Sequence, residues 1–473
     1  MSSSAIAKNF TIQSIGKALS VLVGLASIAI ITRALGPESF GEYTTAITFV
    51  QLFAVVVDFG LTLTLVVMIS ESGSDESQVV GNFISLRFIS GMILFSLAPL
   101  AVLGFDWSFT IKLGVVVGAV AFLFASSAGM LIGIFQKHKA MWRSALAELI
   151  NRLVLILLIA VFAYLHYGVI AMIAAMIIAN LVWWILMIKF ATPFVRIRPK
   201  FEMVIWKKAL SKSWPIAISI FFNLLYLKGD ILFLAYFRDQ SEVGLYGLAY
   251  RVLDVLTALP VMFMGLVLPN MVAAWSSNST SKFQHYLNNT FDVFMIGIIP
   301  IIAGVFALSL PIIQFIAGPG YDESALVLNL LILAGVGVFL GALYGHTIIA
   351  INKQKLMVWG YILVAIVSIV GYLWLIPIMG MFGAAYVTIA SEILITILTF
   401  GVVIKTTGIW PNLKITFKAI LASLIMYFIL ITIPQWHIII MIIIGVLVYF
   451  LIMLLISGIK LQTIKNLIPN SKV

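Results

Sequence analysis

Long runs of apolar residues, separated by short polar or turn-forming segments, fill almost the whole chain. The runs are continuous rather than alternating, which excludes a transmembrane β-barrel. A membrane-spanning helix needs about 20 apolar residues. The pattern therefore predicts fourteen spanning helices, at residues 11–32, 43–69, 83–104, 111–135, 144–165, 168–190, 213–237, 245–271, 288–316, 324–351, 356–376, 380–404, 416–433 and 437–457.

The composition agrees with this pattern. Hydrophobic residues make up 63% of the 473 positions and charged residues only 10%, whereas soluble domains average about 25% charged. A soluble enzyme is excluded, and the spans leave no room for a sizeable soluble domain. The predicted fold class is an all-α integral membrane protein.

The distribution of positive charge predicts the orientation. With the N-terminus placed in the cytoplasm and charges near a span end counted on the adjacent side, 21 of the 28 Lys and Arg residues fall inside, three fall outside and four remain within spans. Cytoplasmic loops of membrane proteins carry such an excess. We therefore expect a multi-pass protein of the cell membrane with both termini in the cytoplasm. The net charge of +11 is then explained by orientation, and no nucleic-acid partner is expected.

The longest cytoplasmic connection is residues 191–212. From Phe201 its apolar residues recur at helical spacing, with lysines on the other face, which is typical of a helix lying in the lipid headgroup layer. This basic linker divides the chain into a first lobe (1–190), the linker (191–212), a second lobe (213–405), and two last helices with a tail (406–473).

The two halves resemble each other. Gly41-Glu42-Tyr43 enters the second predicted span and Gly244-Leu245-Tyr246 enters the eighth, offset by 203 residues. Lys137-His138-Lys139 and Lys353-Gln354-Lys355 follow the fourth and tenth spans, offset by 216. Six spans separate the copies, so they share one orientation, as in transporters built from parallel repeats.

We single out nine charged residues that lie within spans. A charge at mid-bilayer costs about 2.5–3.5 kcal/mol on insertion scales, so such residues face a protein interior or a wet cavity and mark candidate functional sites. They are Asp58, Arg87, Glu148, Arg152, Lys228, Asp230, Arg251, Asp254 and Glu392.

Spacing predicts how some of these charges are arranged. Glu148 and Arg152 are four residues apart, and Arg251 and Asp254 are three apart, so each pair shares a helix face and can neutralise itself. Lys228 and Asp230 are two apart and point to different faces. Each of these two needs water or a partner on another helix.

Asp58 and Glu392 are lone carboxylates at mid-depth. A carboxyl group in apolar surroundings holds its proton more tightly than in water and can exchange it near neutral pH. The two acids are therefore candidates for coupling transport to protons or sodium. The alternative is a structural acid that only accepts hydrogen bonds.

Several chemistries are absent from the sequence. Zero cysteines exclude disulfides and thiolate metal sites, and no His, Asp and Glu spacing resembles a metal site. No GxxxxGK[ST] phosphate loop is present, so ATP is not the direct energy source. We expect neither a metal nor a cofactor, with an ion gradient as the candidate energy source.

Residues 32–43, Thr-Arg-Ala-Leu-Gly-Pro-Glu-Ser-Phe-Gly-Glu-Tyr, resemble the turn between the first two helices of the polysaccharide-transporter family. The Asp58-Phe59-Gly60 element and the Gly380-Met381-Phe382-Gly383-Ala384-Ala385 segment are also similar to motifs of that family. The resemblance implies two six-helix lobes around a central cavity, as in multidrug exporters and the lipid II flippase. It also implies a substrate, a polyprenyl-(pyro)phosphate-linked oligosaccharide moved from the inner to the outer leaflet for assembly of an O-antigen-like surface polysaccharide. Polysaccharide polymerases and glycosyltransferases are then candidate protein partners, beside the membrane lipids.

A pyrophosphate moving through a low-dielectric protein needs fixed cations. The hypothesis is that Arg87, Arg152, Lys228 and Arg251 line the cavity and bind the phosphates, with Arg33 at its outer mouth. Arg33 has an alternative role, a turn residue that meets Glu38, Glu42 or a lipid phosphate.

Two other classes of protein compete with this interpretation. A small-molecule antiporter of the multidrug-exporter type would share the fold, but such proteins carry a carboxylate in the first helix, and residues 11–32 contain none. A membrane glycosyltransferase or polymerase needs a sizeable outer loop, and the predicted outer loops are short. The sequence therefore predicts a transporter rather than an enzyme.

Overall fold

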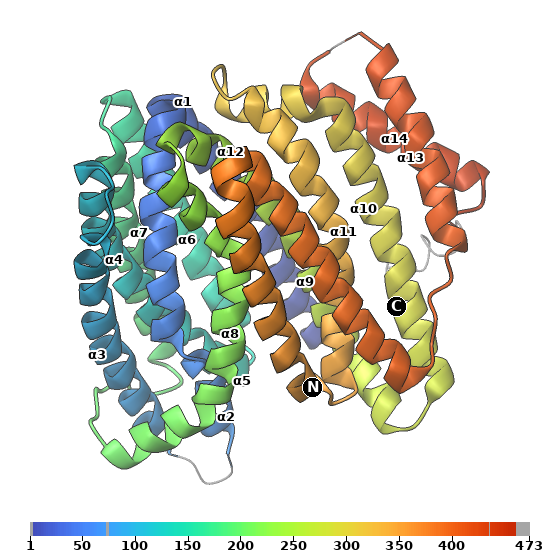
Figure 1. The fold of residues 1–473 in the computed structure, drawn as a ribbon. Helices are drawn as coiled ribbons and strands as arrows, with labels where there is room; N and C mark the ends of the chain where they lie inside the picture. Colours follow the sequence, from blue (N-terminus) through green and yellow to red (C-terminus); the bar gives the residue numbers. More distant parts are fainter. Residues whose placement is uncertain (1–2, 72–74, 435, 460–473) are drawn as a thin grey trace. The chain divides into compact units, whose positions relative to one another are not determined.

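The protein, described by a computed structural model, consists of helices joined by short connections (Figure 1). The structure describes residues 3–71, 75–434 and 436–459, with side chains except those of 3–18, 215–216, 218–220, 223–227 and 257. The helices over these residues are α1 (Ser3–Asp58), α2 (Leu61–Ser70), α3 (Glu76–Val102), α4 (Phe109–Met130), α5 (Ile132–Lys137), α6 (Met141–Tyr164), α7 (Val169–Ala191), α8 (Met203–Phe237), α9 (Gln240–Ser276), α10 (Thr280–Ala317), α11 (Glu323–Ala350), α12 (Gln354–Thr407), α13 (Lys414–Thr432) and α14 (Ile438–Leu455).

The expectation of an all-α membrane protein is confirmed. Among the described residues, eleven helical stretches are long and apolar enough to cross a membrane. Each of the fourteen apolar runs of the sequence falls on these helices, apart from a few residues at the ends and at the breaks between helices. The count of eleven treats residues 19–70 and 354–407 as single stretches and does not include α8.

Two of the helices are interrupted by a glycine. α1 has 56 residues, about 84 Å at 1.5 Å per residue, far more than a bilayer core of about 30 Å requires. It breaks at Gly36 (φ 73°, ψ 173°), a backbone conformation open essentially only to glycine, and Pro37 follows. α12 breaks in the same way at Gly380 (φ 56°, ψ −134°), three residues after Pro377.

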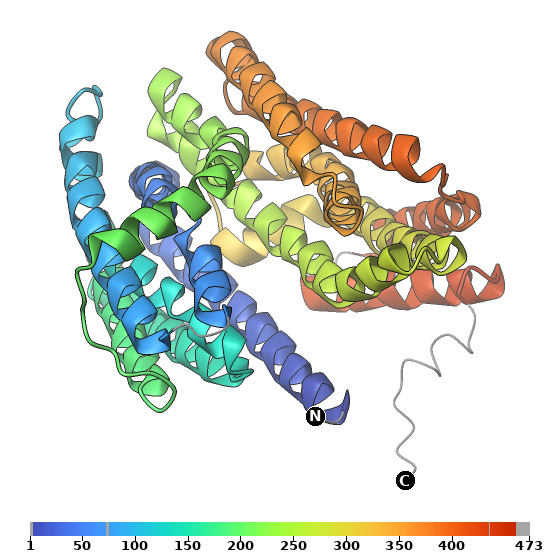
Figure 2. The same cartoon turned by 90° about the horizontal axis from the view of Figure 1, so that it is seen from below.

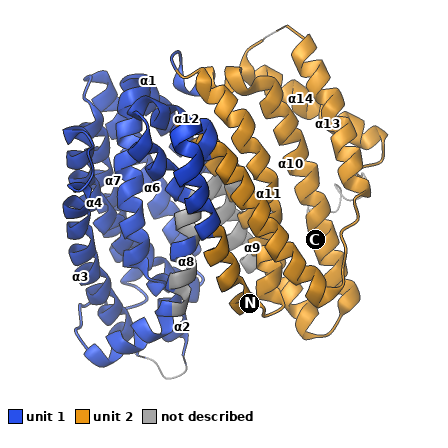
Figure 3. Ribbon diagram, in the orientation of Figure 1, with its two compact units in different colours: residues 1–247, 316–320, 365–384 blue, residues 248–315, 321–364, 385–473 orange. Residues whose placement is uncertain are grey.

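The chain divides into two compact units (Figure 3). Unit 1 comprises residues 1–247, 316–320 and 365–384, and unit 2 comprises 248–315, 321–364 and 385–473. Unit 1 therefore contains short segments from the second half of the chain together with the whole first half.

The core of unit 1 includes a cluster that α2, α3, α5, α7 and the start of α8 build together, with Leu65, Phe83 and Phe135 fully buried. After a turn at residues 192–195, residues 196–202 connect α7 to α8 without regular secondary structure (Figures 1 and 2), and the Lys200 amide donates to the Gly81 carbonyl of α3 at 3.2 Å. The helix predicted after Phe201 is confirmed from Met203 onward. It does not end at the linker boundary of 212, since a single helix, α8, runs from Met203 to Phe237.

In unit 2 a separate core cluster joins α13 and α14 to α10. Ala419, Ala422 and Met441 are buried in it, and the Tyr449 hydroxyl donates to the Ile296 carbonyl at 2.9 Å. The last two helices thus pack on α10 as part of a folded unit.

Candidate functional site

The break between α1 and α2 holds an ion pair. Phe59 (φ 43°) and Gly60 (φ 71°) lie in the left-handed region and interrupt the helix at the Asp58-Phe59-Gly60 element. Arg87 of α3 enters the gap, where its Nη1 donates to the Val57 carbonyl at 2.7 Å and its Nη2 donates to the Asp58 carboxylate. Thr62 of α2 donates its hydroxyl to the same carboxylate at 2.6 Å.

Asp58 is therefore not the lone carboxylate that the sequence suggested. The break leaves carbonyls of α1 without intrahelical partners, and a guanidinium with several donors satisfies both a carbonyl and the carboxylate. Arg87 is only 3% exposed. In this structure its charge is neutralised within the protein.

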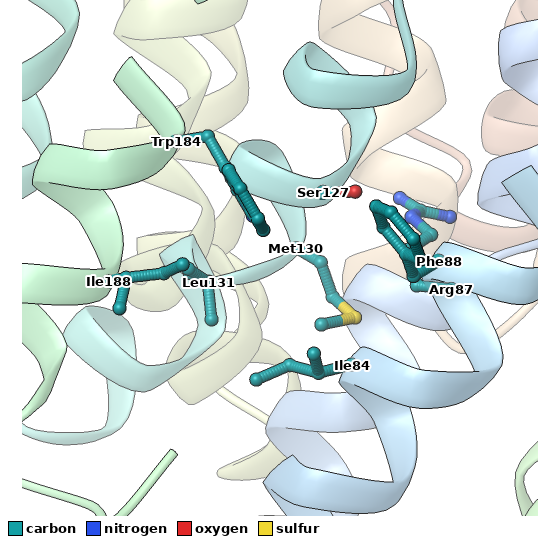
Figure 4. Close-up of a pocket in the computed structure, with 8 residues that line it drawn as sticks. All are labelled: Ile84, Arg87, Phe88, Ser127, Met130, Leu131, Trp184 and Ile188. Carbon is teal, nitrogen blue, oxygen red and sulfur yellow. The ribbon is translucent and has the colours of Figure 1, made fainter. Parts of the chain in front are cut away.

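The cavity beside Arg87 is small. It has a volume of about 20 Å³ and is lined by apolar side chains with Arg87 and Ser127 (Figure 4). A space of that size holds about one water molecule. It cannot admit a sugar or a pyrophosphate group.

Two further cations of the hypothesis lie on α1 and α6. Arg33, an exposed residue three positions before the Gly36 break, donates from Nε to the Ile316 carbonyl at 3.2 Å. Arg152 on α6 is half-buried, and its Nε is shielded from solvent without a hydrogen-bond partner among the described residues. Glu148, one turn before Arg152, is also half-buried.

The α8 charges lie in different environments, as their spacing predicts. Asp230 is fully buried, and its carboxylate accepts the Tyr246 hydroxyl of α9 at 2.6 Å and the Ile231 amide at 2.8 Å. The expected partner on another helix is thus a tyrosine. Lys228, two residues earlier, is half-buried.

The predicted pair on α9 is present. An Nη atom of Arg251 lies 3.6 Å from the Asp254 carboxylate, one turn away, and both side chains are about a third exposed, at 27% and 34%. This guanidinium is thus far more accessible than that of Arg87.

Glu392 on α12 is 5% exposed. α12 packs closely on α11 here. A Cβ added to Gly337 of α11 would lie only 2.7 Å from the Glu392 Cβ. The Thr396 hydroxyl, one turn further, donates to the Gly337 carbonyl at 3.0 Å. Among the described side chains, none forms an ion pair with Glu392.

The sequence did not single out Glu242. Its carboxylate accepts the Met381 amide at 2.9 Å and thereby caps the half of α12 that begins after the Gly380 break. Arg238, one turn earlier, lies 3.8 Å from the same carboxylate. Its place in the predicted outer connection between residues 237 and 245 was the available signal, but nothing in the sequence linked it to a residue 139 positions away.

Glu71 was also missed. It follows α2 and binds Lys208, at 2.9 Å, and Lys212, both on the first turns of α8. Hydrogen bonds from Lys212 and Lys208 lower the pKa of Glu71 from 4.5 to about 2. Part of the cationic face predicted to meet lipid headgroups thus meets a carboxylate of the protein.

The membrane-length helices, with ion pairs along them, define a multi-pass membrane protein. The chain is similar to the structure titled lipid II flippase MurJ, inward closed conformation, with a TM-score of 0.78 at 18% identity over 93% of this chain and 97% of that one. It is also similar to an inward-facing multidrug resistance MATE family transporter of the MOP superfamily, with a TM-score of 0.64 at 15% identity over 82% and 94%. The family described as Polysaccharide biosynthesis protein matches residues 6–275, and the chain belongs to that family.

Two curated relatives extend the match. The probable low-salt glycan biosynthesis flippase Agl15 of Haloferax volcanii is 24% identical over 384 residues, 78% of each chain. The putative O-antigen transporter of Escherichia coli is 23% identical over 404 residues, 79% of this chain and 91% of the relative. The predicted family is thereby confirmed, and the chain is a membrane transporter rather than an enzyme.

Proposed function

We propose that the protein moves a polyprenyl-(pyro)phosphate-linked oligosaccharide from the inner to the outer leaflet by alternating access. The observation that carries the proposal is the family match, together with two relatives that cover more than three quarters of the chain and are described as a glycan flippase and an O-antigen transporter. The fold supports it, since the lipid II flippase is similar over 93% of the chain.

The proposed topology has fourteen spans with both termini in the cytoplasm. α1 and α12 each supply two spans, one on either side of Gly36 and Gly380, and α8 supplies one more, which raises the eleven stretches to fourteen. On this topology residues 1–190 and 213–405 form the two six-span lobes, residues 191–212 join them, and residues 406–473 follow.

Arg251 and Lys228 are the strongest candidates for contacts with the phosphates. Arg251 is partly accessible and is held by Asp254 at 3.6 Å, a distance that leaves donors free for a phosphate oxygen. Lys228 is half-buried on α8. Arg152 and Arg33 are secondary candidates, whereas the donors of Arg87 already serve Val57 and Asp58.

Glu392 is the proposed coupling acid. Its buried carboxylate has no ion-pair partner among the described side chains. A buried carboxylate without an ion-pair partner is stabilised when it binds a proton or a small cation. Glu392→Gln should uncouple transport from the ion gradient. Normal, gradient-driven transport by this variant would exclude the role.

A cell-based experiment separates the proposed function from small-molecule export. In cells that depend on this protein, its depletion should cause lipid-linked oligosaccharide to accumulate in the inner leaflet, and wild-type protein should relieve the accumulation. Arg251→Ala and Lys228→Ala should insert normally but fail to relieve it. Unchanged oligosaccharide distribution on depletion, together with increased drug sensitivity, would favour the antiporter.

A further inference from the structure

Unit 1 contains a contact between the two sequence repeats that is made by backbone rather than by side chains. It lies between the second half of α1 and the first turns of α9, and we call it the glycine seam. Its members are Pro37, Gly41 and Thr44 on α1 and Gln240, Gly244 and Gly247 on α9.

The two central glycines leave no room for a side chain. A Cβ added to Gly41 would lie 2.7 Å from the carbonyl carbon of Gln240, and closer still to its oxygen. A Cβ added to Gly244 would lie 2.9 Å from the carbonyl carbon of Pro37, and again closer to the oxygen. Small residues permit such close approach of helices, and an alanine at either position would force the segments apart.

The seam is reciprocal. Gly41 meets Gln240 while Gly244 meets Pro37, and at the third position Gly247 would place a Cβ 3.0 Å from Thr44 Cγ2. Each α9 residue is 203 positions after its α1 counterpart, the offset that relates the two repeats in the sequence. Equivalent residues of the repeats thus contact each other as residues do across a two-fold axis.

Other contacts at the same end reinforce the seam. The Thr45 hydroxyl donates to the Gln240 side-chain oxygen at 2.7 Å, and the Trp107 indole donates to the Ala235 carbonyl at 2.9 Å. Both bonds join the first half of the chain to the second. They are a few hydrogen bonds around a small backbone contact, an assembly that can separate without disrupting a large core.

The distribution of positive charge assigns this end of the spans to the outside. An alternating-access cycle requires the outer ends of the two repeats to separate in one state and to close in the other. We propose that the glycine seam is the outer gate, and that Gly41 and Gly244 are small because the closed gate needs their backbones in contact. The inference rests on the proposed transport cycle, but not on which substrate is carried.

The chain contains no cysteine, so a single thiol reports on the gate. Thr44 suits this purpose because it is 1% exposed. Its hydroxyl has no hydrogen-bond partner among the described residues, so Thr44→Cys removes no hydrogen bond to them. In intact cells or outside-out vesicles, a membrane-impermeant maleimide should label the thiol at position 44 slowly in the parent. Adding Gly41→Ala or Gly244→Ala should raise the rate about tenfold, because overpacking disfavours only the closed state.

Gly129→Ala is the matched control, since an added Cβ at this α4 glycine meets nothing within 4 Å. It should leave the labelling rate unchanged. Equal labelling rates for the two seam variants and this control would overturn the proposal, as would labelling only from the cytoplasmic side. If the seam variants are labelled faster than the control but the protein does not transport the oligosaccharide, the proposed substrate is refuted and the proposed gate is retained.

If the alanine variants do not fold, a crosslinking experiment tests whether the seam must open. Thr45→Cys combined with Gln240→Cys places two thiols where the native side chains touch. Joining them with a short bis-methanethiosulfonate should reduce transport at least tenfold, and a reductant should restore it. Transport by the crosslinked protein at the rate of the uncrosslinked double variant would show that the seam does not need to open.

Discussion

At the scale of single residues, the environment of each buried charge decides what that charge can do. Arg87 and Arg251 have the same side chain, yet one is 3% exposed and bound to a backbone carbonyl and a carboxylate, while the other is 27% exposed. The first fills a defect in the helix. The second retains the capacity to bind an anion.

Removing Arg87 should therefore destabilise the fold. Arg87→Ala leaves the Val57 carbonyl and the Asp58 carboxylate without their donors, and breaking a buried pair costs about 3–5 kcal/mol. Unfolding in detergent should show a loss of that size, whereas Arg251→Ala should lose about 1 kcal/mol or less. If Arg87→Ala unfolds like the parent but abolishes transport, Arg87 acts on the substrate instead.

The Glu71 pair gives a pH prediction. Because folding lowers the pKa of Glu71 from 4.5 to about 2, the carboxylate contributes its full stability above pH 4.5 and loses it as the pH falls toward 2. The difference in unfolding temperature between the parent and Glu71→Gln should be small, should be largest above pH 4.5 and should vanish near pH 2. It should also shrink with added salt, since the pair is exposed. A difference independent of pH would refute this assignment.

The sequence indicated which charges are buried but not all of their partners. Pairs on one helix, such as Arg251 and Asp254, follow from the helical period. The partnership of Asp58 with Arg87 does not, because it depends on two left-handed residues, Phe59 and Gly60, that interrupt the helix 28 and 27 positions before Arg87 in the chain. The helical period cannot predict contacts that depend on a local break in the backbone.

At the scale of elements, glycine breaks set where one span ends and the next begins. Gly36 and Gly380 take backbone conformations that strain other residues by about 1–3 kcal/mol. At Gly380 a Cβ would also overlap the Glu242 carboxylate that caps the following helix.

Alanine at these two breaks should destabilise the protein. Gly36→Ala should lose about 1–3 kcal/mol from backbone strain alone, since an added Cβ there meets nothing within 4 Å. Gly380→Ala should lose more, because it adds the overlap with Glu242. Unfolding temperature in detergent measures both. Gly401→Ala, within α12 and also in open space, should be neutral or slightly stabilising. A Gly380→Ala protein as stable as the Gly401→Ala protein would contradict the account.

The hydrophobic pattern predicted the positions of the membrane-length helices well, because a span of about 20 apolar residues is a strong signal, but it did not predict the short helices α2 and α5 as separate elements. It placed the basic linker less well. The pattern indicated a separate surface helix, yet Ile205 and Ala209 pack into the unit 1 core while Val204 remains exposed. Apolar spacing alone could not distinguish a helix bound to lipid from one bound to protein.

At the scale of the whole molecule, the charge distribution makes a topological prediction. The connection between α6 and α7 should lie outside and that between α9 and α10 inside. Because the chain lacks cysteine, single thiols introduced by His166→Cys and Asn278→Cys, both at exposed positions, test this directly. An impermeant maleimide added to intact cells should label the first and not the second until the membrane is permeabilised. The reverse pattern would invert the proposed orientation.

On the proposed function, the protein itself moves the lipid-linked oligosaccharide across the bilayer. The purified protein should be reconstituted into vesicles with a polyprenyl-pyrophosphate oligosaccharide, and the glycan exposed outside should be followed with a membrane-impermeant glycosidase. Wild-type protein should bring nearly all the glycan into reach of the enzyme, whereas empty vesicles and the Arg251→Ala protein should leave about half protected. Protection that stays at half with wild-type protein, with and without a proton or sodium gradient, would contradict the account.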